Sequence, residues 1–253
     1  MADAALDLAA EHAGLTAELK ALGTEYLGGD QNDSYTGSGH PFFCVSAPNM
    51  RRVTRGWLSA HRKTYGAEVL ALAERLMVEG VHYEEKVLGA LILGYSAKAR
   101  AAATPARIEA WLDHLQGWAE IDSLCASVFG AADVAADWPG WAALIDRLSR
   151  DANINKRRAA LVFLVTPTRT SDDARFRDLG FEVVERLKGE KPILITKAVS
   201  WLLRSMTAHA GPAVAAYLDA NTASLPAIAV RETRAKLASG TKSGRPAKPR
   251  PGA

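Results

Sequence analysis

The chain has 253 residues, 48% of them hydrophobic, and a net charge of +3 at pH 7. That length and apolar fraction allow one large core or two small domains. No run of the sequence approaches the roughly 18 apolar residues of a membrane span. The acidic first residues show no secretory or transit pattern. We therefore expect a cytoplasmic protein that makes no contact with a membrane.

The positive charge is concentrated at the C-terminal end. The segment from residue 239 onward contains no acid and carries four cations: Lys242, Arg245, Lys248 and Arg250. Removing these four charges from the total of +3 leaves a net charge of −1 for the rest of the chain. Any affinity for nucleic acid must therefore come from local patches together with this tail. The tail has no apolar content and is predicted to be disordered, either as a solubilising extension or as a non-specific attraction for phosphate.

Helical periodicity runs through nearly the whole chain, and almost no segment alternates with period two. Proline recurs where helices should begin, because its missing N–H would be unpaired in a first turn anyway. The predicted helices span residues 3–27, 48–63, 66–79, 83–99, 105–115, 117–130, 139–150, 154–166, 171–188, 192–209, 212–221 and 225–238. Their short connections favour antiparallel neighbours. The sequence thus predicts an all-α solenoid of helical pairs, with one domain over residues 1–238 and a disordered basic tail over 239–253.

One long irregular segment, residues 28–40, interrupts the helices. Its Asp, Asn and Ser residues are spaced as in a calcium-binding loop, but Tyr35 stands where that loop needs Gly and Pro41 where it needs Glu. We reject calcium binding and expect a mobile surface loop. The His and Cys residues show no metal-ligand spacing, so we expect no metal and no cofactor. Cys44 and Cys125 should be reduced, buried thiols.

An aromatic residue and a carboxylate stand four residues apart in the predicted helix 117–130. The apolar stripe of this helix consists of Ile121, Leu124, Cys125 and Val128. Trp118, Asp122 and Phe129 fall on a different flank, which for Asp122 is roughly 110° from the centre of the stripe. Residues at i and i+4 are side-by-side neighbours. Trp118 and Asp122 are therefore suited to holding a cation between an aromatic ring and a negative charge.

Trp201 lies off the apolar stripe of the predicted helix 192–209, next to Lys197 and near Arg204. A Trp between two cations can serve as a platform for a sugar or a base. A Trp buried against the next helical pair would give the same pattern, so the periodicity leaves both interpretations open.

Lys156, Arg157 and Arg158 fill the first turn of the otherwise apolar predicted helix 154–166. Three cations at this position oppose the helix macrodipole, which favours a nearby anion. That anion is either a carboxylate of this chain, as is common for a buried Arg, or a phosphate.

The predicted helix 48–63 starts at Pro48 and places Arg51, Arg55 and Arg62 on one face. A helix start with free N–H groups and a row of Arg side chains can bind phosphates. Most such rows are solvated faces without a ligand. Because no acidic residue interrupts this row, we favour anion binding.

No nucleophilic triad is recognisable, since no Ser-His-Asp or Cys-His arrangement has a family-like local sequence. Glu84 and Glu85, at the start of the predicted helix 83–99, are interpreted as complementing the helix dipole. The candidate functional groups are therefore one carboxylate, two Trp side chains and clustered Arg side chains.

In this order, these segments resemble the DNA alkylation-repair glycosylases of the AlkD family. The resemblance spans roughly residues 20–238 and is strongest in Phe42-Phe-Cys-Val-Ser-Ala-Pro-Asn-Met-Arg-Arg52, Trp118-Ala-Glu-Ile-Asp122, Lys156-Arg-Arg-Ala-Ala160 and Lys197-Ala-Val-Ser-Trp-Leu-Leu-Arg204. Each motif alone is weak, but four in register are fairly specific. The resemblance implies a curved all-α fold of HEAT-like repeats. It also implies a monomer that binds double-stranded DNA containing alkylated purines and is nucleoid-associated when bound.

The resemblance also implies a reaction and roles for individual residues. The enzyme would excise N3- and N7-alkylated purines without flipping the base. Trp118 and Trp201 would contact the deoxyribose, and Asp122 would stabilise the developing oxocarbenium ion and position the attacking water. Arg158, matched in preference to Arg157, would lie beside that site and hold a backbone phosphate.

The DNA-binding positions that the resemblance implies are Arg51, Arg55, Lys197, Arg204, Ser46 and Pro48. Where family members can carry Gln before a Thr-Pro pair, this chain has Ser46-Ala47-Pro48, which shortens or removes two polar contacts. A cationic base is a good leaving group, so the reaction needs no general acid. A carboxylate and aromatic faces are sufficient to stabilise the developing charge.

Two other functions stay open as alternatives. A helical-repeat DNA-binding protein without catalysis would have lost the carboxylate, whereas this chain retains Asp122 with both Trp residues. A helical protein-interaction scaffold would have an apolar or acidic groove in place of Arg clusters. Salt-sensitive DNA affinity separates these two alternatives, and release of a base separates the glycosylase from both.

Overall fold

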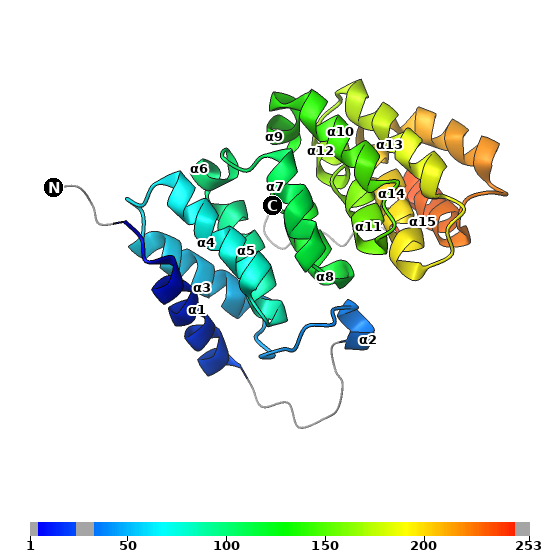
Figure 1. The fold of residues 1–253 in the computed structure, drawn as a ribbon. Helices are drawn as coiled ribbons and strands as arrows, with labels where there is room; N and C mark the ends of the chain where they lie inside the picture. The colour runs from blue at the N-terminus through cyan, green and yellow to red at the C-terminus, as the bar shows by residue number, and fades with distance from the viewer. Residues whose placement is uncertain (1–4, 24–32, 246–253) are drawn as a thin grey trace, which may run out of the picture. The chain divides into compact units, whose positions relative to one another are not determined.

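The structure, a computed structural model, describes residues 5–23 and 33–245. All regular structure in these residues is helical (Figure 1). The predicted all-α fold is therefore confirmed. The chain divides into two compact units, Met1–Phe129 and Gly130–Ala253. Within the described ranges, no helix is both long and apolar enough to cross a membrane.

The first unit is organised around a central helix, α5, which contacts α1, α3, α4 and α8. Its elements are α1 (Leu8–Leu22), α2 (Asp33–Thr36), α3 (Ala47–Ala60), α4 (Gly66–Glu79), α5 (Tyr83–Tyr95), α6 (Ala97–Arg100), α7 (Pro105–Trp111), the 3₁₀ helix η1 (Leu112–His114) and α8 (Gly117–Cys125). Its core includes the fully buried side chains of Leu76, Leu88 and Trp111. The most extensive packing in this unit joins α4 to α5, two consecutive helices.

The second unit is organised around a long helix, α14, which contacts α11, α12, α13 and α15. Its elements are α9 (Ala131–Ala136), α10 (Trp138–Leu148), α11 (Ile154–Val162), α12 (Val165–Thr170), α13 (Ala174–Leu187), α14 (Ile193–Asn221) and α15 (Ala227–Ser239). Phe163, Phe176 and Leu202 are fully buried in its core. Consecutive helices pack against each other in both units, an arrangement compatible with a helical-repeat solenoid.

Several helix ends differ from the prediction because side chains cap them. Of the predicted helix 3–27, residues 3–4 and 24–27 lie outside the described residues. Helix α1 begins at Leu8, because the Asp7 carboxylate caps it by accepting from the N–H groups of Ala9 and Ala10. The predicted helix 83–99 is divided into α5 and α6 at Ser96, whose hydroxyl caps α6. Periodicity alone does not register such breaks, because the apolar pattern continues across them.

The predicted helices 192–209 and 212–221 form one bent element, α14. Its backbone leaves helical geometry at Ala210, where φ is −133° and ψ is 33°. Pro212 causes the bend, because a proline ring inside a helix removes an N–H donor and collides with the preceding turn. The predicted break between the two helices is therefore confirmed, as a kink at Ala210.

The segment predicted as a mobile surface loop, residues 28–40, lies partly outside the described residues, which resume at residue 33. In its described part the prediction of a surface loop is only partly right, because residues 37–40 are non-helical and Tyr35, Gly37 and Gly39 are exposed, but other residues differ. Residues 33–36 form α2, and Thr36 and Ser38 are buried. At the other end of the chain, α15 runs to Ser239 and turns continue to residue 245, while 246–253 lie outside the described residues.

The buried carboxylate of Glu84 fastens an irregular segment, residues 41–45, to the start of α5. Its oxygens accept hydrogen bonds from the backbone N–H groups of Phe43 and Val45, at 2.9 and 3.0 Å. The N–H of Tyr83 donates in return to the carbonyl of Pro41, at 2.9 Å. Because α3 begins directly after this segment, Glu84 fixes where the first Arg-bearing helix starts.

Glu85, the next residue, attaches α1 to the start of α5. Its carboxylate accepts hydrogen bonds from the backbone N–H of His82, from Thr16 Oγ1 and from His12 Nε2, at 2.8 to 2.9 Å. The side chain is only 3% exposed. The interpretation of this acidic pair as simple complements of the helix dipole is therefore incomplete, because both carboxylates also join α5 to other segments.

We predict that Glu85→Gln destabilises the fold in a pH-dependent way. Burial raises the pKa of Glu85, but hydrogen bonds from His82, Thr16 and His12 outweigh burial and lower this pKa from 4.5 to about 2. Because the folded-state pKa lies below the unfolded value, the ionised carboxylate stabilises the fold above pH 4.5. That stabilisation is lost as the pH falls from 4.5 towards 2.

Urea unfolding at pH 7 and at pH 3 tests this expectation. The variant should lose about 2–3 kcal/mol of unfolding free energy at pH 7, and its difference from the wild type should shrink at pH 3. Glu18→Gln, at an exposed position on α1, should behave as the wild type at both pH values. A difference between Glu85→Gln and the wild type that does not change with pH would show that the carboxylate charge is not what stabilises this junction.

Candidate functional site

The aromatic–carboxylate pair lies in α8, on the flank that periodicity indicates. Trp118 and Asp122, one helical turn apart, are both half-buried, whereas Ile121 and Leu124 are fully buried. The expectation for Phe129 is wrong, because α8 ends at Cys125 and Phe129 packs into the core with 2% exposure. The side chains that α8 presents together are therefore Trp118 and Asp122.

Tyr35 holds the Trp118 ring in place. The indole Nε1–H donates a hydrogen bond to the backbone carbonyl of Tyr35. The two rings also meet edge to face, with centroids 5.3 Å apart and planes at 88°. Tyr35 is 70% exposed, so its ring extends the aromatic surface next to Trp118. Sequence reasoning missed Tyr35, because nothing in the local pattern pairs residues 83 positions apart.

A close backbone contact between two glycines makes this arrangement possible. Gly37 and Gly117 both have positive φ angles, of 68° and 71°. A Cβ atom on Gly117 would lie 2.3 Å from the Thr36 carbonyl oxygen, closer than real atoms approach. Glycine is therefore required at the start of α8, because it supplies both the left-handed conformation and the space for residues 36–37.

Glu120 adds hydrogen bonds to this contact between residues 36–40 and the start of α8. Its carboxylate accepts hydrogen bonds from Ser38 Oγ, from the backbone N–H of Gln116 and from His40 Nδ1, the last at 3.0 Å. Ser, His and Glu side chains meet here, but Ser38 is fully buried and the same Glu120 oxygen contacts both Ser38 and His40. This cluster is a structural connection that attaches residues 38–40 to α8, unlike a nucleophilic triad, whose Ser is accessible.

Exposed Arg side chains follow the start of α3. Ser46 Oγ caps the helix by accepting from the backbone N–H of Asn49 at 3.4 Å, and Pro48 occupies the first turn, as expected. Arg51 and Arg55 are exposed, and neither forms an ion pair among the described residues. The Arg55 guanidinium lies 5.5 Å from the centroid of the Tyr95 ring. These two side chains remain available for an anion.

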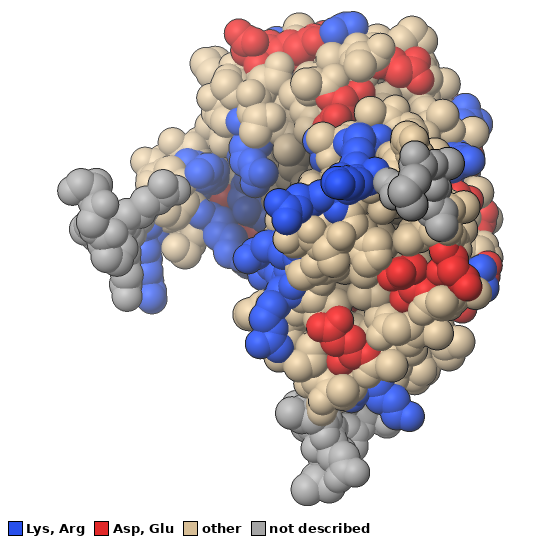
Figure 2. All heavy atoms as spheres, turned by 90° about the vertical axis from the view of Figure 1, so that its left-hand side faces the viewer, with Lys and Arg blue, Asp and Glu red and all other residues tan. Residues whose placement is uncertain are grey.

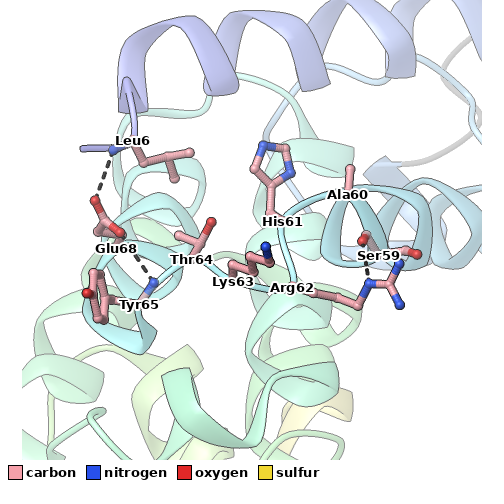
Figure 3. Close-up of a pocket in the computed structure, with 9 residues that line it drawn as sticks. All are labelled: Leu6, Ser59, Ala60, His61, Arg62, Lys63, Thr64, Tyr65 and Glu68. Carbon is pink, nitrogen blue, oxygen red and sulfur yellow. Dashed lines mark hydrogen bonds between the residues drawn. The ribbon is translucent and has the colours of Figure 1, made fainter. Parts of the chain in front are cut away.

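The third member of the predicted Arg row, Arg62, is not on the helix. The last residue of α3 is Ala60, and Arg62 Nε donates to the carbonyl of Ser59 at 3.1 Å. Arg62 instead lines a cavity of about 650 Å³ between the start of α1 and the turn that follows α3 (Figure 3). The Glu68 carboxylate beside it accepts the backbone N–H groups of Leu6 and Tyr65. Apart from Arg62, none of the candidate site residues lines this cavity.

In the second unit, the three cations of α11 have different partners. Arg157 forms an ion pair with Glu190, with Nε 2.8 Å from Oε1, and Lys156 Nζ lies 3.8 Å from Asp151 Oδ2. Arg158 is only 4% exposed, and its Nη1 donates to the carbonyl of Leu194 at 2.5 Å. The predicted anions for Arg157 and Lys156 are thus carboxylates of this chain.

Trp201 is half-buried on α14, which leaves part of its ring accessible. The Arg204 Nε lies 3.3 Å from Glu232 Oε2 and also donates to Ser200 Oγ. Burial lowers the pKa of Arg204, and the nearby Glu232 charge acts in the opposite direction. Lys197 is exposed. Trp201 and Arg204 together line a groove in this unit, and the alternative of a fully buried Trp is wrong.

On the face drawn in Figure 2, Lys and Arg side chains gather in the centre and to the left, whereas Asp and Glu side chains lie mainly at the top and right, with some Lys and Arg side chains among them. Among residues 5–23 and 33–245, no three His, Cys, Asp or Glu side chains are grouped so that they could hold a metal ion.

Cys125 is buried as expected, but Cys44 is only partly buried. Burial and the Glu84 charge raise the pKa of the Cys44 thiol, which keeps it protonated.

A family model described as DNA alkylation repair enzyme matches residues 15–237. This range is most of the chain and includes every candidate residue above. The chain therefore belongs to the DNA alkylation repair enzyme family, and its role is in the repair of alkylated DNA. No curated protein matches the chain.

We predict that Gly117→Ala detaches residues 35–40 from α8. The added Cβ would be strained at a φ of 71° and would collide with the Thr36 carbonyl. Hydrogen exchange of the amides of residues 36–40 should become at least about tenfold faster, for a cost of about 1–3 kcal/mol. Gly130→Ala is a suitable control, since its Cβ would meet only Asp133 Oδ2, at 3.6 Å. Unchanged protection in Gly117→Ala would contradict the glycine requirement.

Proposed function

We propose that this DNA alkylation repair enzyme is a glycosylase that hydrolyses the N-glycosidic bond of N3- and N7-alkylated purines in duplex DNA. The observation that supports this most directly is the pair of Trp118 and Asp122 on α8. The Trp118 ring is fixed by Tyr35, and the Asp122 side chain is half-buried one turn away. An aromatic face beside a carboxylate is suited to stabilising a cationic sugar.

In the proposed reaction, the bond between C1′ of the deoxyribose and N9 of the alkylated purine breaks. Its electron pair goes to the cationic base, which leaves as a neutral molecule. The sugar acquires oxocarbenium character, as in glycoside hydrolysis. Asp122 stabilises this charge and orients a water molecule, whose oxygen bonds to C1′ while one of its protons is lost to solvent. The products are a free alkylpurine and an abasic site.

The charge already present on an alkylated base explains why a single carboxylate is enough. A cationic purine is a good leaving group, so the reaction needs no general acid to protonate it. We further propose that the base stays in the helical stack and that the protein acts from the sugar side. Such a site needs no enclosed base pocket, which allows bulky adducts. Most glycosylases, in contrast, extrude the base.

Phosphate contacts are proposed for the exposed Arg side chains of α3. Arg51 and Arg55 have no acidic partner among the described residues and stand in the second and third turns of a helix without acids in its first turn. Positive side chains near a helix N-terminus favour phosphate oxygens. Ser46 and Pro48, both exposed, lie at the start of the same helix, within reach of the same strand.

In the second unit, Trp201 is proposed to contact the deoxyribose, and Lys197 and Arg204 the phosphates on either side of it. Arg158 has a different environment from the phosphate contact that the resemblance implies. Its burial and its hydrogen bond to the carbonyl of Leu194 favour a positioning role. In that role Arg158 holds α14, and with it Trp201, against α11.

The two alternative functions are weaker on specific grounds. A non-catalytic DNA-binding protein does not require a carboxylate beside an aromatic ring held by residues distant in sequence. A protein-interaction scaffold does not require exposed Arg side chains without acidic partners in the described ranges. Both alternatives would give no base release.

We predict that wild-type protein releases 7-methylguanine from methylated duplex DNA and that Asp122→Asn slows this release by roughly 100-fold or more. That magnitude is typical for removal of a group that stabilises transition-state charge. Because Asn is nearly isosteric with Asp, affinity for undamaged DNA should stay close to that of the wild type. Single-turnover base release, with DNA binding measured in parallel, gives both quantities.

Asp113→Asn, at an exposed position in η1, is the matched control and should release base at the wild-type rate. Full activity in Asp122→Asn would show that the carboxylate assignment is wrong. No release by the wild type, despite salt-sensitive DNA binding, would favour the non-catalytic alternative.

A second prediction concerns the phosphate contacts of α3. Arg51→Gln/Arg55→Gln should weaken binding of undamaged duplex DNA at low salt. It should also reduce the slope of log K against log salt concentration by about 2, since each phosphate contributes about 0.9. Lys20→Gln/Arg107→Gln removes two exposed cations elsewhere in the first unit and should leave the slope unchanged. An equal effect of both double variants would mean that α3 contributes only net charge.

A further inference from the structure

A groove of about 570 Å³ extends from Trp201 across the second unit. Its lining residues come from α12, α14, α15 and the turn after α15, and those that matter most are Arg169, Trp201, Arg204, Lys236, Leu237 and Lys242. Neither the sequence motifs nor the proposed function assigns a role to Arg169, Lys236 or Leu237, and for Lys242 the sequence suggests only the non-specific phosphate attraction of the basic tail. We call this set the α15 groove.

The lining of the α15 groove contains four cations and no acidic residue. Arg204 is the one member with an acidic partner, Glu232, which is itself half-buried on α15. Arg169 and Lys242 are exposed, and among the described residues neither forms an ion pair. Uncompensated cations facing one groove attract an anion with several charges, because each cation alone interacts only weakly across water.

The chain beyond α15 is folded so that Lys242 reaches this groove. Gly240 ends the helix in a left-handed conformation with φ of 75°, which reverses the chain direction. Lys236 Nζ donates to the carbonyl of Gly240, and Thr241 Oγ1 donates to the carbonyl of Arg245. The start of the basic tail therefore lines one side of the groove. Within the tail, the described residues end at 245.

The accessible part of Trp201 and the side chain of Leu237 add an apolar surface to the cations. A nucleic-acid strand offers the matching pattern, with sugars and bases that contact an aromatic ring and phosphates at regular spacing on either side. An acidic peptide offers negative charge, but it has no sugar for an aromatic face. The combination of one ring with several cations therefore favours a DNA strand.

We propose that the α15 groove binds the backbone phosphates of the DNA strand next to the nucleotide held at Trp201. This inference rests on the proposed function, since it takes the same DNA as the ligand. It adds Arg169, Lys236 and Lys242 as phosphate contacts and assigns the first ordered residues of the basic tail a specific position on the DNA.

The test measures the binding of undamaged duplex DNA to full-length protein at a series of salt concentrations. Lys236→Gln/Lys242→Gln should reduce the slope of log K against log salt by about 2 and weaken binding at low salt at least about tenfold. The matched control is Arg231→Gln/Arg234→Gln, which removes two exposed cations from α15 that do not line the groove. That control should keep the wild-type slope.

A wild-type slope in Lys236→Gln/Lys242→Gln would overturn the inference, as would an equal loss in the control. If poly-glutamate binds the wild type and loses affinity in Lys236→Gln/Lys242→Gln while the DNA slope is unchanged, the groove binds an acidic protein and the DNA assignment is wrong. Release of 7-methylguanine by the same preparations separates the two claims. If the wild type releases base and the slope of Lys236→Gln/Lys242→Gln is unchanged, only the proposal for the groove is rejected. If the slope of this variant is reduced but the wild type releases no base, only the glycosylase proposal is rejected.

Discussion

Buried carboxylates in the first turns of two helices hold the non-helical parts of the first unit in place. Glu84 and Glu85 in α5 accept hydrogen bonds from residues 41–45 and from α1, and Glu120 in α8 accepts them from Ser38 and His40. A helical protein has no sheet to satisfy the backbone of such segments, so side chains must do it. Two groups with proposed roles, the exposed Arg51 on α3 and the half-buried Trp118 beside Tyr35, depend on these contacts for their positions.

Much of the fold follows from sequence periodicity, because each helix buries one apolar stripe. The boundaries of α4 agree with the predicted residues 66–79, and Pro212 produces a kink where two helices were predicted. The errors arise where tertiary contacts override local pattern. Residues 33–40 look like a polar loop, yet Ser38 is fully buried because Glu120, 82 positions away, accepts its hydrogen bond. A local sequence pattern cannot identify a hydrogen-bond partner so far away in the chain.

In the candidate site, too, some features follow from helical spacing and others depend on contacts between residues far apart in the sequence. Helical spacing places Trp118 and Asp122 on one flank, but it leaves open whether Trp201 is buried, and only the structure shows that ring to be partly accessible. Spacing does not reveal that Tyr35 contacts Trp118, nor that Arg157 is already paired with Glu190. Both contacts join residues far apart in the sequence. The α15 groove could not be predicted from the sequence for the same reason, because its cations come from separate helices and a turn.

The central claim is that a carboxylate and aromatic rings suffice because the base itself carries the positive charge. Single-turnover release of 7-methylguanine, a cationic base, beside that of hypoxanthine, a neutral one, from otherwise identical duplexes tests this claim most directly. We predict release of 7-methylguanine and a rate for hypoxanthine at least roughly 100-fold lower. Comparable rates for both bases would contradict it, since a neutral base leaves readily only when an acid protonates it.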